Sequence, residues 1–220
     1  MTSTRSPDLQ RFLDVALAAF ARRATAEESR ASLRRIAAAA GRVGSQRQGC
    51  GSRQPVCGHL DPVLDALAAH PDLGPLAQAF RAVEPALRWT ARATNGTASA
   101  NFPTSHANAV VVGPGGIEQR GDIWIGLSLL APHVRYPDHD HAPEETYLVL
   151  SDGEFRQGDG PWFAPGVGGS FYNPPGILHA MRSGNAPLLA MWALCSPGEK
   201  AAGRSRFRRR LSGASGHRPG

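Results

Sequence analysis

Apolar residues in the first part of the chain recur at the spacing of amphipathic helices. Within residues 8–23 they fall at intervals of three and four, which places them on one helical face: Leu9, Phe12, Leu13, Ala16, Leu17 and Phe20. Three more helices are predicted, from a capping box at Thr25–Glu28 to the alanines before Gly41, from Asp61 to Ala69, and from Asp72 to about Val83. Residues 1–94 are therefore predicted to form a helical segment that packs on the rest of the protein.

The pattern changes after Thr94. Residues 95–108 have the composition of a turn-rich linker, and after them short apolar or alternating stretches predict strands at 109–112, 122–130, 144–150, 154–157, 170–172, 178–182 and 188–194. Asp152-Gly153 lies between two of these strands and predicts a hairpin turn. Many short strands separated by turns are typical of an antiparallel sandwich or barrel.

The length and composition narrow the class of protein. A chain of 220 residues is long enough for one sizeable core with a helical addition. It has no stretch of the roughly 20 apolar residues that a membrane span requires, and residues 1–7 lack the pattern of a secretory signal. The odd number of cysteines, Cys50, Cys57 and Cys195, suggests a reducing compartment, so we expect a cytoplasmic protein in which these thiols have no functional role.

The net charge of +6 comes from the end of the chain. Residues 201–220 hold six arginines and no acidic residue, which leaves residues 1–200 balanced at 18 basic and 18 acidic side chains. A segment of arginine, serine and glycine is predicted to be a basic disordered tail. Because the remainder is neutral, we expect neither nucleic acid nor a membrane as a partner.

Candidate metal ligands gather in one part of the chain. His139 and His141 are two residues apart, so on an extended strand they point to the same side; Glu145 follows four residues later, and His179 lies on a later strand. On the strand from Glu144, the side chains of Glu145, Tyr147 and Val149 share a face. Three imidazoles and one carboxylate suit one divalent transition metal ion such as Fe, Zn, Mn, Ni or Co, whereas the absence of a thiolate argues against a structural zinc site.

These residues resemble the two motifs of the cupin superfamily. The first motif reads His139-x-His141, Glu145 and Gly153, and the second reads Gly168, Pro174-x-Gly176 and His179. The chain departs from the usual pattern in three places: His133 replaces an opening glycine, Gly153 comes one residue late, and Ser183 replaces a closing asparagine. The resemblance implies an α+β, mainly β fold, with a double-stranded β-helix barrel over residues 95–200 after the helical segment.

A narrower resemblance adds the tyrosines. Tyr136, Glu145-x-Tyr147 and the run from Asn173 to Met181 are similar to the cupin-type dimethylsulfoniopropionate (DMSP) lyases, nearest the DddQ-like branch. That family eliminates dimethyl sulfide from DMSP and leaves acrylate. The resemblance implies DMSP as the substrate, a metal that binds its carboxylate, Tyr147 as the base and Tyr136 as a second catalytic residue that orients the carboxylate or carries the proton.

Two other functions remain compatible with the sequence. Cupins with this ligand set also include dioxygenases and isomerases that act on other small carboxylates, and some cupins bind a ligand without catalysis. The positive sulfonium of DMSP would favour aromatic faces, for which Trp162, Phe163, Tyr172 and Trp192 are available. The helical segment offers a surface for a possible homodimer.

Overall fold

The computed structural model describes residues 4–195, so the predicted basic tail at 201–220 lies outside the described residues. The helices are α1 (Pro7–Arg23), α2 (Glu27–Ala40), α3 (Leu60–Ala68) and α4 (Gly74–Val83). The strands are β1 (Ser45–Gln46), β2 (Trp89–Thr90), β3 (His106–Val112), β4 (Glu118–Gln119), β5 (Ile123–Leu130), β6 (Glu144–Val149), β7 (Glu154–Gln157), β8 (Ser170–Asn173), β9 (His179–Arg182) and β10 (Leu188–Cys195). None of the described helices is long and apolar enough to cross a membrane.

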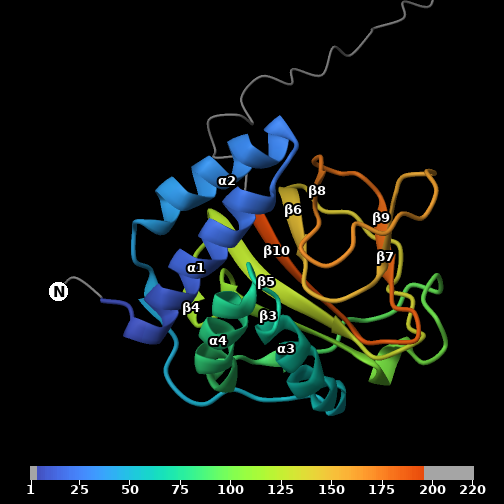
Figure 1. Cartoon of the computed structure of the whole chain (residues 1–220), viewed down its shortest axis with the longest axis horizontal. Helices are drawn as coiled ribbons and strands as arrows, with labels where there is room; N and C mark the ends of the chain where they lie inside the picture. The colour runs from blue at the N-terminus through green and yellow to red at the C-terminus, as the bar shows by residue number, and fades with distance from the viewer. Residues whose placement is uncertain (1–3, 196–220) are drawn as a thin grey trace, which may run out of the picture.

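The strands form two sheets. The large sheet has the order β1-β4-β3-β5-β10-β6-β8, with β2 added beside β3, and the small sheet is the antiparallel pair β7-β9. The helices lie together on one side of the large sheet, and β7 and β9 lie at the opposite end of the molecule (Figure 1). The segment before residue 94 is thus mainly helical, as predicted, but it also supplies β1 and β2 to the sheet.

The two faces of the large sheet bury different cores. One set of alternating side chains packs under the helices, including Leu127, Leu148 and Met191. The neighbouring residues on the same strands point the other way, toward the small sheet, and there Tyr147 and Val149 pack with Phe155. Successive side chains on a strand point to opposite faces, so the predicted shared face of Glu145, Tyr147 and Val149 is turned away from the helices.

The predicted hairpin at Ser151–Glu154 is wrong. Strand β6 pairs with β10 and β8, whereas β7 pairs with β9, so this segment carries the chain from one sheet to the other. The Ser151 hydroxyl donates to the Pro187 carbonyl over 2.8 Å and accepts from the Leu189 amide over 2.6 Å, which ties the segment to the start of β10. The φ of Gly153 is not positive. The type I′ turn that an Asp-Gly pair forms in a two-residue hairpin requires a positive φ at the glycine.

Three predicted helix starts are also wrong. Helix α4 begins at Gly74 after Leu73, so Asp72 does not open it. Helix α2 begins at Glu27 after Ala26, without a side-chain cap, so Thr25 and Glu28 do not form the expected capping box. Helix α3 begins at Leu60 and not after Asp61, because the 3-10 helix Pro55–His59 runs directly into it and takes the place of a cap.

The two substituted cupin positions have clear conformations. His133 replaces the glycine and adopts a φ of 58°, a left-handed conformation that costs a non-glycine residue roughly 1–2 kcal/mol. Ser183 replaces the asparagine, and its buried hydroxyl donates to the Ala131 carbonyl over 2.6 Å and accepts from the Val134 amide over 2.9 Å. A serine therefore provides the hydrogen bonds that hold this turn.

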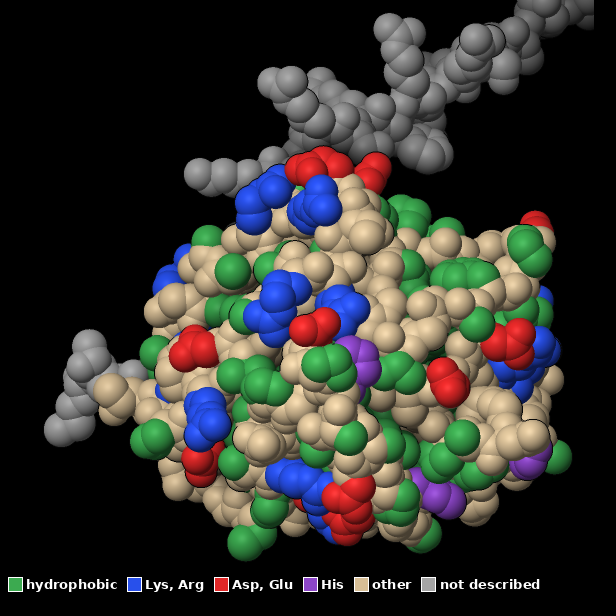
Figure 2. Space-filling model, viewed as in Figure 1, with side chains coloured by type: hydrophobic (Ala, Val, Ile, Leu, Met, Phe, Trp, Pro, Cys, Tyr) green, Lys and Arg blue, Asp and Glu red, His purple; other side chains and the backbone are tan. Residues whose placement is uncertain are grey.

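One buried ion pair joins the helices to the sheet edge. The guanidinium of Arg5 binds both carboxylate oxygens of Glu118 on β4, over 2.5 and 2.9 Å, and it also donates to the Ala40 carbonyl at the end of α2. Burial acts to raise the pKa of Glu118, but hydrogen bonds from Arg5 and the Gly44 amide lower it overall. Other acidic and basic side chains lie beside each other on the exposed helical face (Figure 2).

We expect the substitution Glu118→Gln to lower the free energy of unfolding by about 3–5 kcal/mol, because it leaves the guanidinium of Arg5 buried without a counter-charge. Denaturant unfolding followed by circular dichroism measures this change. The matched control is Glu27→Gln, which removes the same kind of group from the exposed pair with Arg34; it should leave the unfolding midpoint unchanged. Equal effects of the two substitutions would show that the buried pair does not stabilise the fold.

Candidate functional site

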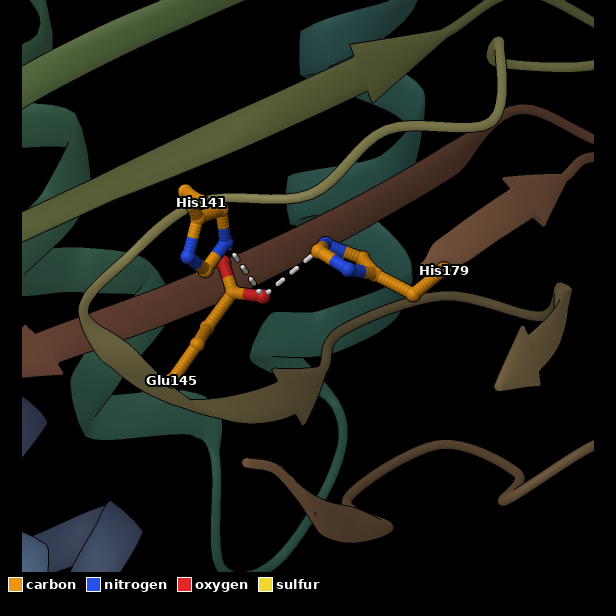
Figure 3. A group of neighbouring side chains, drawn as sticks. All are labelled: His141, Glu145 and His179. Carbon is orange, nitrogen blue, oxygen red and sulfur yellow. Dashed lines mark ion pairs between the residues drawn. The ribbon is translucent and has the colours of Figure 1, made fainter. Parts of the chain in front are cut away.

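The predicted ligands come from separate segments. Glu145 is the second residue of β6, His179 begins β9, and His141 lies in the loop that precedes β6. The three side chains converge (Figure 3). The loop is held against β9 by two backbone hydrogen bonds between His139 and His179, of 3.0 and 2.9 Å. The site therefore lies where the large and small sheets meet.

The ligand atoms of His141, Glu145 and His179 all lie within 4.8 Å of one another. The Nε2 atom of each imidazole is 3.3 Å from the same oxygen, Oε2 of Glu145 (dashed lines in Figure 3). Both Nε2 atoms are buried, and neither has a hydrogen-bond partner. Buried polar atoms without a partner are costly, so these two nitrogens indicate that something else belongs between them.

Backbone carbonyls fix the orientation of the imidazoles. In each predicted histidine ligand, Nδ1 lies within hydrogen-bond distance of the carbonyl oxygen two residues away: Pro137 for His139 (2.9 Å), Pro143 for His141 (2.8 Å) and Ile177 for His179 (2.9 Å). A carbonyl can only accept, so Nδ1 carries the proton and Nε2 keeps its lone pair. This arrangement is the one that metal-binding histidines use.

The donor set fits a metal ion. With Nδ1 bound to a carbonyl, Nε2 of His141 and Nε2 of His179 both face the same carboxylate oxygen, an arrangement that a cation among these three atoms would stabilise. Burial acts to raise the pKa of Glu145, but the two imidazoles lower it overall to about 2, so the carboxylate is charged. Burial acts to lower the pKa of His141, and Glu145 raises it overall. Two imidazoles and a charged carboxylate can hold a divalent transition metal.

The fourth predicted ligand lies beside this group. The ring centroid of His139 is 4.1 Å from that of His179 and 6.2 Å from that of His141. The ring nitrogens of His139 are nevertheless not part of the group of ligand atoms that lie within 4.8 Å of one another. Burial, together with the neighbouring His179, lowers the pKa of His139 to about 3. His139 is therefore neutral, and its Nε2 lone pair is available for a ligand.

Two residues that support Glu145 were not identified as site residues from the sequence. The amide of Asn173 on β8 donates to Oε2 of Glu145 over 3.0 Å. The amide of Gln157 on β7 donates to Oδ1 of Asn173 over 2.6 Å, and this bond fixes which end of the Asn173 amide faces the carboxylate. Asn173 was part of the recognised motif, whereas nothing in the sequence around Gln157 indicates this contact.

Both predicted tyrosines line a cavity of about 340 Å³ together with His139, His141 and Glu145. Tyr147 is 3% exposed and its ring stacks on Phe171 with the centroids 5.1 Å apart. Burial and the charge of Glu145 raise the pKa of Tyr147 well above its ordinary value. Tyr147 is therefore a neutral phenol in the metal-free protein.

A chain of hydrogen-bonded side chains holds the hydroxyl of Tyr136. Its hydroxyl accepts from the amide of Asn108 over 2.9 Å, Asn108 accepts from the hydroxyl of Ser128 over 2.7 Å, and Ser128 accepts from the indole of Trp192 over 3.1 Å. Burial raises the pKa of Tyr136. The roles of Asn108 and Ser128 could not be predicted from the motif, because these residues come from other strands, β3 and β5.

Only one of the four aromatic residues considered for the sulfonium lines the cavity. That residue is Trp192, and Trp124 joins it there. Gly126 makes room for the indole of Trp192, since a Cβ at this position would lie 2.3 Å from it. The other three have different surroundings: the guanidinium of Arg182 lies over Trp162, Phe163 contacts Phe171 edge to face, and the Tyr172 hydroxyl donates to Glu144.

The cysteines take no part in the site. Cys50 is exposed, Cys57 is buried and Cys195 is half-buried, and none of the three is in a disulfide bond. Within residues 4–195, His141, Glu145 and His179 are the one set of histidine, cysteine and acidic side chains close enough together to hold a metal ion.

The chain is similar to a known protein family. A model of the dimethylsulfoniopropionate lyase family matches residues 27–190. No curated protein sequence gives a significant match.

Among solved structures, the DMSP lyase DddQ from Ruegeria pomeroyi DSS-3 is 23% identical with a TM-score of 0.63, and the alignment covers 89% of this chain and 94% of that one. A structure from a study of the DMSP lyases RdDddP and RnDddQII is 20% identical with a TM-score of 0.61, and covers 88% and 94%.

These likenesses confirm the predicted α+β fold, in which strands form most of the chain after a helical segment. The family model spans most of the chain, including every predicted site residue. The chain therefore belongs to the dimethylsulfoniopropionate lyase family.

Proposed function

We propose that this protein cleaves DMSP to dimethyl sulfide and acrylate by β-elimination. The observation that carries the proposal is the buried phenol of Tyr147 in the cavity that His141 and Glu145 also line, where these two side chains converge with His179. A metal-binding cupin does not need a tyrosine at this position, whereas an elimination needs a base. The membership of the chain in the DMSP lyase family supports the choice of substrate.

The residues that would hold the metal are His141, Glu145 and His179, with His139 as the fourth ligand. Fe, Zn, Mn, Ni or Co would suit this set. When bound, a divalent ion supplies a Lewis acid for the substrate carboxylate and a positive charge that favours the phenolate of Tyr147. Asn173 keeps Glu145 oriented while the ligands assemble.

Tyr147 is the proposed base. Its phenolate oxygen takes the proton from the carbon next to the substrate carboxylate, the electrons of that C–H bond form the C=C bond of acrylate, and the C–S bond breaks to release neutral dimethyl sulfide. Tyr147 ends the step as a neutral phenol, the form that its burial favours. The uptake of the proton is therefore favoured by the environment of the base.

Tyr136 and the aromatic wall position the substrate. The Tyr136 hydroxyl accepts a hydrogen bond from Asn108, so its own proton is free to be donated to the substrate carboxylate. The indoles of Trp192 and Trp124 line the same cavity and offer faces for the sulfonium. The carboxylate and the sulfonium of the substrate would thus be bound by different groups.

The first test is metal stoichiometry. We expect the protein reconstituted with Zn²⁺ and desalted to retain about one ion per chain, and the substitutions His141→Ala and His179→Ala to lower the retained amount to below about a tenth, because each removes a nitrogen ligand. Elemental analysis of the purified variants measures this. His59→Ala, which alters a histidine of the helical segment, is the control and should retain the ion. Full retention by both site variants would place the metal elsewhere.

The second test is the reaction itself. We expect the protein supplied with DMSP to release dimethyl sulfide and acrylate in equal amounts, to do so without oxygen, and to lose the activity on chelation and recover it when a metal is returned. Gas chromatography of the headspace and liquid chromatography of the solution measure the two products. Consumption of oxygen with another small carboxylate, and no gas from DMSP, would identify a dioxygenase instead.

The third test concerns the base. The substitution Tyr147→Phe should reduce kcat at least about 10²-fold, because a positioned base contributes about 10²–10⁴-fold, and should leave the metal content unchanged. Tyr172→Phe is the matched control: it removes a phenol hydroxyl that binds Glu144 outside the cavity, and it should retain activity. A Tyr147→Phe enzyme with the kcat of the parent would rule out Tyr147 as the base.

A further inference from the structure

Arg92 is a charged residue of the cavity that has no role in the site described so far. It follows β2 and lines the cavity with Tyr136 and His139. Its guanidinium carbon lies 5.8 Å from the centre of the Tyr136 ring, over the ring face. The side chain is exposed, so a molecule that enters the cavity can reach it.

Arg92 differs from most arginines of the described chain in lacking an acidic partner. Arginines elsewhere pair with carboxylates, as in Arg23–Asp72, Arg81–Asp65 and Arg182–Glu154, and Figure 2 shows blue and red side chains side by side on one face of the molecule. No aspartate or glutamate within residues 4–195 forms an ion pair with Arg92. Its five N–H donors are thus not satisfied by a carboxylate of the protein.

The backbone of Arg92 is anchored beside the cavity. Its amide donates to Nε2 of His106 over 2.7 Å. His106 is buried and stacks on Phe102 with the ring centroids 3.6 Å apart. The backbone of Arg92 is therefore held in place, which reduces the conformational entropy lost when its side chain binds a ligand.

We propose that Arg92 binds the carboxylate of the substrate at the rim of the cavity and selects substrates that carry a carboxylate over those that lack one. The planar guanidinium matches a carboxylate with two parallel hydrogen bonds, and Tyr136 lies beside it to complete the contact. Arg92 is thus a specificity-determining residue for the small carboxylates that enter. The identity of that carboxylate as DMSP rests on the proposed function, but the recognition of a carboxylate does not.

Binding of propionate tests the proposal without catalysis. Propionate has the carboxylate and the three-carbon length of the acyl part of DMSP, and propionamide is its neutral counterpart. For zinc-loaded protein studied by isothermal titration calorimetry, we expect Arg92→Gln to weaken propionate binding about tenfold and to change propionamide binding less than about twofold. Arg92→Lys keeps the charge but not the planar fork, so it should recover part of the affinity.

A control variant removes a positive charge outside the cavity. Arg11→Gln removes one positive charge from the exposed face of α1, and it should leave both affinities unchanged. Equal affinity for propionate in the Arg92→Gln variant and the parent protein would overturn the proposal, as would an equal loss for propionate and propionamide, which would indicate a change of cavity shape.

Kinetics separate this proposal from the proposed function. If the protein releases dimethyl sulfide, Arg92→Gln should raise the KM for DMSP about tenfold while kcat changes less than about threefold. If DMSP proves not to be the substrate, the propionate measurements still decide whether Arg92 recognises carboxylates.

Discussion

A buried carboxylate that faces two imidazole nitrogens governs this structure. Glu145 is charged and almost fully buried, and the Nε2 atoms of His141 and His179 each lie 3.3 Å from its Oε2 atom without a hydrogen-bond partner. In the absence of a cation, this arrangement has an electrostatic cost. It persists because each Nδ1–H is bound to a carbonyl of its own segment, and because the backbone bonds between His139 and His179 hold those segments together. The fold pre-organises the site, and an ion would remove the cost.

The large sheet makes this pre-organisation possible because one of its faces packs the core under the helices and the other lines the cavity. Leu148 of β6 points into the core under the helices, whereas Glu145 and Tyr147, on the opposite face of the same strand, point into the cavity. The helices thus stabilise the site through the sheet without supplying a metal ligand. The first 94 residues also contribute to the cavity, because the segment that follows β2 places Arg92 at its rim.

The sequence predicted what depends on local periodicity and on the motif, and it failed where tertiary contacts decide. The face shared by Glu145, Tyr147 and Val149 follows from strand alternation, and the ligand spacing identified three side chains that converge. The Ser151–Glu154 segment was mistaken for a hairpin because an Asp-Gly pair does not report which strands are partners. The start of β3 at His106 was missed because His106 and Ala107 are not typical strand residues, and pairing with β5 holds them extended. Gln157 and Asn108 act through contacts with residues distant in sequence, for which spacing carries no signal.

The cavity places different demands on the residues that hold the substrate and on those that react with it. Elimination converts a zwitterion into an anion and a neutral thioether, so the carboxylate keeps its charge from substrate to product. A group that binds the carboxylate, as proposed for Arg92, stabilises substrate, transition state and product alike, and it therefore acts on affinity more than on kcat. Tyr147 instead exchanges its charge with the substrate during the reaction, and its contribution arises only in the transition state. Burial suits this second role, because a desolvated phenolate favours uptake of the proton. An exposed position suits the first, because a guanidinium at the rim can bind the carboxylate of the substrate as it enters the cavity and release the carboxylate product after the thioether has left.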